Sequence, residues 1–283
     1  PVSDAIKSEN CPLIKKVDVV DTYTDDNGKS ITIRILFSHP ERTLTKEEVL
    51  EVKELLDKYG IKVSSIGSPL GKIKLDGDMD AHIETAKRVF EYANILGAKF
   101  VRMFSFYAPD GQNIVDMKTE VFSALGRLLD AAREYGVILC HENERGIYGE
   151  TVEGVVDIIK TFEGRIKCVF DHANFITANV EAFPYAYSIL CDDIFYMHIK
   201  DAGHATDGSM QIFPAGEGAG NFEATFRRLN VYDKTFYCTL EPHLKVFGGL
   251  EALEAAKHDG LVKNQFATNE EAFCAAADAI KRY

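Results

Sequence analysis

Two patterns of hydrophobic and polar positions alternate along most of the chain. From about residue 45, amphipathic stretches with helical spacing end in a glycine or a short polar turn, and a short apolar run follows each. The helical stretches are predicted at 45–59, 78–96, 116–135, 151–162, 179–190, 221–229, 249–257 and 269–282. The apolar runs are rich in β-branched and aromatic residues and predict strands at 62–66, 100–106, 137–143, 166–172, 194–200 and 236–242.

The predicted strands are almost continuously apolar, which is typical of parallel strands covered by helices on both faces. Right-handed crossovers between such strands leave two architectures, a doubly wound sheet or a closed barrel. No G-x-G-x-x-G motif follows any of the strands, which disfavours a dinucleotide-binding doubly wound sheet. Because no linker or low-complexity stretch interrupts the pattern, residues 1–283 are expected to form a single barrel domain.

The first 45 residues break this rhythm. A helical segment is predicted near residues 2–9, and two alternating strands at 17–23 and 30–37 are joined by a D-D-N-G turn, which predicts an antiparallel hairpin. Two hairpin strands and six parallel strands make the eight that close a barrel. We therefore expect an α/β fold of the TIM-barrel type, with six parallel βα units and a hairpin that supplies the other two strands.

Four successive strands carry a metal-ligand residue type at or near the carboxyl end, and these residues are Glu142, Asp171, His198 and Glu241. In a parallel barrel all strand carboxyl ends lie on one face, where active sites are built. One acid after a strand is usually a helix cap or a solvated turn residue, but four in succession favour a metal site. Three carboxylates and one imidazole suit Mn²⁺, Mg²⁺ or Co²⁺, with Zn²⁺ as a further candidate.

Composition narrows the classes of function. With 32 Lys and Arg against 44 Asp and Glu, the net charge of −12 argues against nucleic-acid binding. No apolar run is long enough to span a bilayer, and the first residues show no basic or apolar leader. The six cysteines form no C-x-x-C pair, so we expect thiols of a reducing cytoplasm, with Cys140, Cys168 and Cys238 buried in strands.

A family resemblance rests on several motifs: S-I-G-S-P-L-G-K at 65–72, H-E-N-E-R-G-I-Y-G at 141–149, F-D-H-A-N-F at 170–175, H-I-K-D at 198–201, G-E-G at 216–218 and L-E-P-H at 240–243. With these, residues 50–283 resemble the sugar phosphate isomerase/epimerase family of xylose-isomerase-like TIM barrels. The resemblance implies one divalent metal held by Glu142, Asp171, His198 and Glu241, and a sugar or sugar phosphate substrate. It also implies that Glu142 and Glu241 move protons through a cis-enediolate.

Four further side chains are candidates for substrate binding. Lys200 is expected to stabilise the enediolate or bind a phosphate or hydroxyl, unless it is a surface lysine at a strand end. His172 and Asn174 are expected to support the metal ligands or contact substrate. Arg102 is a charged residue inside an apolar run, and it either pairs with a barrel carboxylate or reaches an anionic substrate.

A sister branch of the same superfamily contains DNA-repair endonucleases that hold three zinc ions with additional histidines. Asn174 stands where that branch has one of these histidines, and the strands predicted at 62–66 and 100–106 contain none. The acidic net charge also disfavours binding to nucleic acid. Nuclease activity is therefore not expected.

A second resemblance covers residues 1–48, through segments 2–7, 11–14, 19–23, 28–34 and 40–48. These are similar to the ferredoxin-fold anticodon-binding domain of the phenylalanyl-tRNA synthetase β chain. The similarity favours a chimera, with engineering as one origin, over a divergent natural N-terminus. An α-β-β-α fragment would then replace the first two units of the barrel in segment 49–283. Imperfect closure of the barrel would expose a sheet edge and favour a homodimer. An inactive chimeric scaffold is the alternative to an isomerase or epimerase function.

Overall fold

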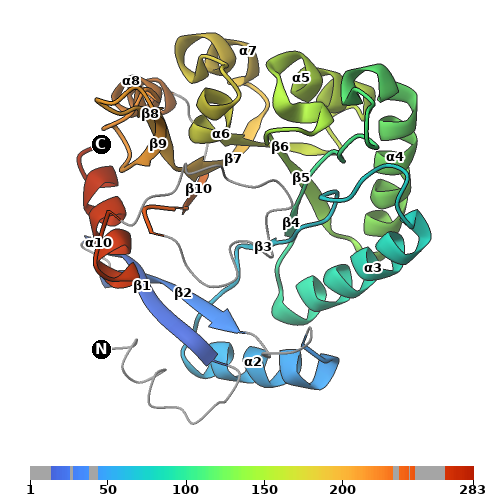
Figure 1. The fold of residues 1–283 in the computed structure, drawn as a ribbon. Helices are drawn as coiled ribbons and strands as arrows, with labels where there is room; N and C mark the ends of the chain where they lie inside the picture. Colours follow the sequence, from blue (N-terminus) through green and yellow to red (C-terminus); the bar gives the residue numbers. More distant parts are fainter. Residues whose placement is uncertain (1–13, 26–27, 38–43, 232–235, 242, 246–264) are drawn as a thin grey trace.

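A curled sheet of parallel strands organises the molecule. The computed structural model describes residues 14–25, 28–37, 44–231, 236–241, 243–245 and 265–283. The sheet has the strand order β10-β7-β6-β5-β4-β3, and every neighbouring pair is parallel. Its strands are β3 (Ser65–Gly67), β4 (Phe100–Met103), β5 (Ile138–Glu142), β6 (Lys167–Asp171), β7 (Ile194–Ile199) and β10 (Tyr237–Leu240). Figure 1 shows this sheet as an open half-barrel with helices around its outside, which confirms the six parallel strands expected from the sequence.

Helices precede or follow each strand and cover the outer face of the sheet (Figure 1). They are α2 (Lys46–Lys58), α3 (Met79–Leu96), η1 (Ile114–Met117), α4 (Lys118–Tyr135), η2 (Tyr148–Glu150), α5 (Val152–Thr161), α6 (His172–Thr177), η3 (Ala182–Ala186), α7 (Tyr187–Leu190), α8 (Phe222–Leu229) and α10 (Asn269–Ile280). Thr45 and Glu48 form a reciprocal capping box at the start of α2. Gly97 and Gly136 end α3 and α4 in the left-handed conformation, as the sequence predicted for glycines after an amphipathic stretch.

Two helical predictions differ in detail from the structure, and one helix was not predicted. The helix predicted at 116–135 is α4 from Lys118 onward, with its first two residues in the 3₁₀ turn η1, and 179–190 contains a π-helical turn followed by the short α7. Helix α6 begins directly after β6 and was not predicted, because a stretch of six residues is too short to show a helical periodicity. The helices predicted near 2–9 and at 249–257 lie outside the described residues.

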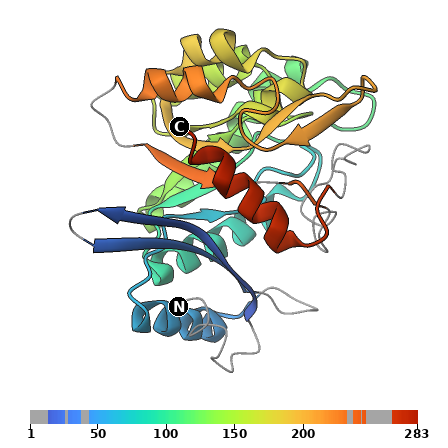
Figure 2. The same ribbon diagram turned by 90° about the vertical axis from the view of Figure 1, so that its left-hand side faces the viewer.

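The N-terminal hairpin forms as predicted but not in the predicted place. β1 (Ile14–Asp25) and β2 (Gly28–Phe37) pair antiparallel with each other, and within the described ranges neither strand pairs with β3 or β10. The expectation that the hairpin takes the first two places of a closed barrel is therefore wrong for the described part of the chain. Two-stranded ribbons twist strongly, and two register shifts in this pair distort it further, so its edge does not match the edge of the parallel sheet. Figure 2 shows the hairpin beside α10.

Aromatic side chains fill the space between the sheet and its helices. Phe90 and Phe106 are fully buried in the part of the core around β4, and Phe170, Phe175 and Phe222 are fully buried around β6 and β7. Each such side chain contributes about 1.5–3 kcal/mol through burial. This packing holds the carboxyl ends of the central strands in fixed positions.

Two further elements complete the described chain. β8 (Asp201–His204) and β9 (Met210–Phe213) form a small antiparallel pair that the sequence did not predict. Cys140 and Cys168 are buried as expected, but Cys238 is exposed, because β10 is the last strand of the open sheet. Among the described helices, none combines the length and the hydropathy that a membrane crossing requires.

Candidate metal centre

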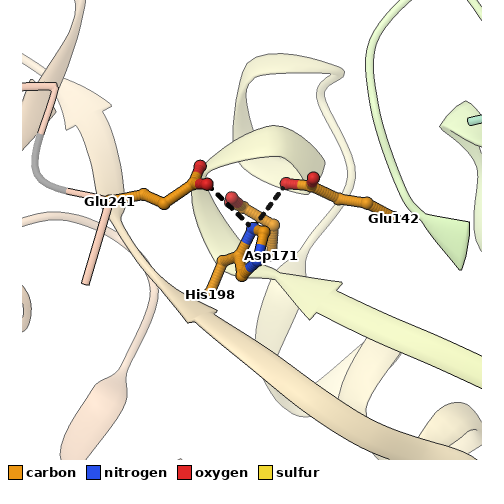
Figure 3. A group of neighbouring side chains, drawn as sticks. All are labelled: Glu142, Asp171, His198 and Glu241. Atoms are coloured by element: carbon orange, nitrogen blue, oxygen red, sulfur yellow. Dashed lines mark hydrogen bonds and ion pairs between the residues drawn. The ribbon is translucent and has the colours of Figure 1, made fainter. Parts of the chain in front are cut away.

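The four predicted ligands lie together at the carboxyl end of the parallel sheet. Glu142 is the last residue of β5, Asp171 is the last residue of β6, His198 lies in β7, and Glu241 directly follows β10. One ligand atom from each residue lies within 4.8 Å of the corresponding atoms of the other three. Figure 3 shows the two glutamates on opposite sides of the imidazole, with the aspartate behind it. Parallel register produces this convergence, since Asp171 pairs directly with His198 across the sheet.

Two asparagines hold the ligand-bearing strand ends in place. The side chain of Asn143 donates to the Asp171 carbonyl and accepts from the Asp171 backbone N–H, both at 2.9 Å, which locks the ends of β5 and β6 together. Asn174 donates its amide to Glu142 Oε1 at 3.3 Å and to the Asn143 carbonyl at 2.9 Å. Asn174 was a predicted candidate, whereas Asn143 was missed. Its place between Glu142 and Glu144 in H-E-N-E was the available signal.

The imidazole of His198 links the two glutamates. Its Nδ1 lies 2.9 Å from Glu142 Oε1 and 3.5 Å from Glu241 Oε1. Burial would lower the pKa of His198, but the two carboxylates outweigh burial and raise it. Burial would likewise raise the pKa of Glu142, yet His198 and Arg102 lower it to about 2. Both glutamates are therefore ionised at neutral pH, because the pKa of Glu241 is also held well below its usual value against the effect of burial.

Two permanent cations of the chain also reach the carboxylates. Arg102 Nη1 lies 3.0 Å from Glu142 Oε2 and 3.3 Å from Glu241 Oε1, so the structure realises the first of the two alternatives for this residue, pairing with barrel carboxylates. Lys200 Nζ lies 3.0 Å from Asp171 Oδ2 and 3.9 Å from Glu241 Oε2. Lys200 is only 6% exposed, which excludes the surface-lysine alternative.

The pair formed by Asp171 and Lys200 is completely enclosed. Burial raises the pKa of Asp171 to about 7, although the nearby ammonium group acts in the opposite direction. Burial would lower the pKa of Lys200, but the carboxylates of Asp171 and Glu241 raise it, so the lysine keeps its charge. Asp171 also accepts the backbone N–H of Asn174 at 2.9 Å and so caps α6.

His172 lies apart from this group. Its Nε2 is 3.1 Å from Thr225 Oγ1, and its ring lies 4.2 Å from the ring of Phe222. Burial lowers the pKa of His172 to about 3, so the ring is neutral. The structure thus places this predicted candidate in the core behind the strand rather than against the four ligands.

A glycine-rich loop next to the site is anchored by Asp201. The carboxylate accepts backbone N–H groups from Gly216 at 2.8 Å, Gly218 at 3.0 Å and Gly220 at 2.9 Å. A side chain at Gly218 or Gly220 would meet the Asp201 carboxylate at 2.5 Å or 2.8 Å, so glycine is required at both positions. The sequence analysis quoted H-I-K-D and G-E-G but did not connect them, although the spaced glycines were the signal of a loop that wraps an anion.

The donor set fits one divalent cation. Three carboxylates and one imidazole on rigid strand ends match the ligand preferences of Mn²⁺, Mg²⁺, Co²⁺ and, with the imidazole, Zn²⁺. Glu142, Asp171 and His198 are buried and Glu241 is partly buried, so their charges have little access to solvent. Such a group of acids requires cations nearby, and the site can recruit one from outside in addition to Arg102 and Lys200.

Comparison with known proteins agrees with this geometry. A family model described as xylose isomerase-like TIM barrel matches residues 29–259. A search of curated proteins found no match to the sequence. Among solved structures, a D-psicose 3-epimerase with D-tagatose from Clostridium cellulolyticum H10 has a TM-score of 0.63 at 14% identity, covering 84% of this chain and 83% of that one.

Two other similar structures contain metal ions. IOLI protein with a bound zinc atom has a TM-score of 0.60 at 19% identity, covering 83% of this chain and 80% of that chain. A xylose isomerase-like TIM barrel protein from Mycobacterium smegmatis in complex with magnesium has a TM-score of 0.60 at 17% identity, covering 84% and 78%. At these identities the likeness establishes a shared fold.

Proposed function

The chain belongs to the xylose isomerase-like TIM barrel family, and we propose that it is a divalent-metal-dependent isomerase or epimerase of sugars or sugar phosphates. The observation that carries the proposal is the convergence of Glu142, Asp171, His198 and Glu241 within 4.8 Å at the carboxyl end of the sheet. Similar structures include a sugar epimerase with a ketose, which supports a substrate of this class.

The four converging residues would hold the ion, with Mn²⁺, Mg²⁺ or Co²⁺ favoured by the three carboxylates and Zn²⁺ as a further candidate. A bound divalent ion supplies Lewis-acid polarisation of carbonyl and hydroxyl oxygens. Asn143 and Asn174 orient Asp171 and Glu142, so these two metal-binding residues would be in position before the ion binds.

Glu142 and Glu241 would move the protons. They project from opposite ends of a four-strand arc, and Figure 3 shows them facing each other across the imidazole of His198. The pKa of each is lowered despite burial, so each is ionised and able to accept a proton. One glutamate, as the carboxylate, would remove the proton beside the substrate carbonyl and become the acid, and the other, after it has taken up a proton from solvent, would return that proton to the cis-enediolate from the opposite side.

The buried lysine would assist the anionic intermediate. Lys200 keeps its charge and reaches both Asp171 and Glu241, so its ammonium group can balance negative charge that develops on the substrate oxygens. A phosphate or hydroxyl of the substrate is a second partner for the same group. His172 has no place in this proposal because its contacts lie in the core.

A folded scaffold without turnover is the alternative function. Arg102 and Lys200 already bind the carboxylates, which favours a network that is stable without catalysis.

We also propose cytoplasmic action on a small molecule, without nucleic acid, in line with the buried Cys140 thiol and the charge of −12. The chimeric origin, and a homodimer formed through the edges at β3 and β10, stay predictions.

The test is metal-dependent proton exchange. Purified protein would be analysed for bound divalent metal and incubated in D₂O with a panel of ketohexoses and their phosphates. We expect deuterium incorporation that chelation abolishes, and a loss of about 10²–10⁴-fold in E142Q and in E241Q. E144Q is the matched control, because Glu144 lies two residues from Glu142 but pairs with Lys72.

Exchange that persists in both glutamine variants would contradict the proposed acid–base roles. A folded protein that binds metal without exchange on any ketose would contradict an isomerase or epimerase of these sugars. A folded protein with neither bound metal nor exchange would support the inactive scaffold. A structure with metal bound by all four residues would support the proposed ligand set.

A further inference from the structure

We infer that Arg102 is an intramolecular competitor of the divalent cation, so that this arginine sets the metal affinity of the site. The inference rests on the proposed function, because it concerns the same four ligands. It adds a residue that is no ligand but holds two ligands, Glu142 and Glu241, through its own positive charge.

The contacts of Arg102 place its charge where it opposes an incoming cation. A single nitrogen, Nη1, bridges Glu142 Oε2 at 3.0 Å and Glu241 Oε1 at 3.3 Å. The Glu241 oxygen is the same one that lies 3.5 Å from His198 Nδ1, so it belongs to the inner side of the ligand group. A metal ion and the guanidinium therefore seek the same carboxylate oxygen, and two cations this close repel each other strongly in a buried site.

The arginine is held loosely enough to give way. Its side chain is 21% exposed, and its Nε is buried without a hydrogen-bond partner among the described residues. The third contact, from Nη2 to the Ser68 carbonyl, is long at 3.4 Å. The guanidinium also lies over the ring of Phe104, at 4.9 Å from its centroid, and this ring is a surface along which the planar group can shift.

Lys200 does not share this behaviour. Its side chain is 5% exposed, and its partner Asp171 is completely buried, so removing the ammonium group would leave a buried carboxylate without its closest cation. Arg102 is therefore the cation that metal binding displaces, and Lys200 is the one that stays. A divalent ion adds two positive charges beside Arg102 and Lys200, and this favours release of the arginine from the glutamates.

The experiment measures metal affinity directly by titration calorimetry of metal-stripped full-length protein with Mn²⁺ and, separately, Mg²⁺. We expect R102Q to bind each ion at least about tenfold more tightly than the original protein, because the competing charge is gone. R102K keeps a positive charge and is expected to stay closer to the original affinity. Thermal unfolding of each variant without metal verifies that the protein is folded.

K72Q is the matched control for charge alone. Lys72 lies over the same Phe104 ring, at 4.4 Å, but its ion pair is with Glu144 and not with any of the four ligands. We expect its effect on metal affinity to be clearly smaller than that of R102Q. Equal gains in both variants would overturn direct competition in favour of a general charge effect.

The remaining outcomes separate the inference from the proposed function. If the original protein binds metal and a folded R102Q binds it equally tightly or more weakly, the inference alone is overturned. The arginine would then be a structural residue whose removal leaves the ligands unchanged or loosens them. Binding of neither ion by either protein would overturn both the metal site and the inference. If R102Q does not fold, R102M takes its place as the variant without the charge: an affinity that rises no further in a folded R102M than in K72Q overturns the competition.

Discussion

The half-barrel and the N-terminal hairpin differ in the pattern of their strands, almost continuously apolar in the first and alternating in the second, and in what strand pairing achieves. In the half-barrel, each parallel strand pairs with residues at least 26 positions away in the chain, and all carboxyl ends meet at one edge. In the hairpin, β1 and β2 pair with each other and with no other described strand. Non-local parallel pairing therefore gathers distant side chains into a site, whereas local antiparallel pairing gathers none of the four candidate ligands.

The small β8–β9 pair combines features of both regions, because its strands pair locally but its first residue binds a more distant segment. It is also a local antiparallel hairpin, but its first residue, Asp201, binds the loop that contains Gly216, Gly218 and Gly220. That single carboxylate connects the hairpin to the end of β7 and to the start of α8. The hairpin is thus tied to the loop before α8 by one buried carboxylate, at a residue that closely follows β7 in the chain.

The largest expected effect comes from placing proline in a strand of the parallel sheet, with the same change in the hairpin as the control. V169P removes a ladder hydrogen bond from β6, between β5 and β7, and we expect a loss of about 3 kcal/mol or more in unfolding free energy together with loss of metal binding. T32P in β2 is the matched change in the hairpin. We expect its metal affinity to stay within about twofold of the original, as calorimetry and denaturant unfolding would show. A comparable loss of affinity in T32P would contradict the separation of the two regions.

An intermediate effect is expected at Asp201. D201N keeps the size of the side chain but replaces one accepting oxygen by a donor that faces backbone N–H groups. We expect a loss of about 2–3 kcal/mol in unfolding free energy, because buried donors lose their partner. Urea unfolding measures the loss, and D207N in the turn of the same hairpin is the control. Equal stability of D201N and the original protein would contradict the anchoring role.

The smallest expected effect concerns pH. His82 accepts the backbone N–H of Gly71 through Nε2 at 2.9 Å, and burial lowers its pKa. A lowered histidine pKa means that the stabilising contribution is present above about pH 6.5 and is lost as pH falls below that value, because the unfolded chain then binds the proton more readily. Between pH 7 and pH 5.5 the original protein should lose more thermal stability than H82Q. Parallel curves for the two proteins would contradict this assignment.

Much of the half-barrel was predictable because its signals are local. Amphipathic periodicity and the glycines at 97 and 136 located α3 and α4, and apolar runs located all six parallel strands. The four candidate ligands were predictable too, since parallel strands bring their carboxyl ends to one edge whatever the details of packing.

The contacts around the four candidate ligands were harder to predict from the sequence. Arg102 had two equally acceptable partners in the sequence, and only the distance between β4 and the ends of β5 and β10 decides that it pairs with the two glutamates. His172 lies one residue from a ligand, yet the turn into α6 directs its ring to Thr225 in the core. Residue spacing does not determine such directions, because they depend on where a chain segment turns after its strand.

The sequence by itself determined the order of the six parallel strands, the antiparallel hairpin and the identity of the four converging residues, because each of these follows from short-range periodicity and from strand direction. Only the tertiary structure decided that the hairpin stays apart from the sheet, that Cys238 is exposed on the edge strand and that Arg102 and Lys200 neutralise the candidate site. These depend on contacts between segments far apart in the chain, where the twist of each sheet and the cost of burying charge select one arrangement among several that the local pattern allows.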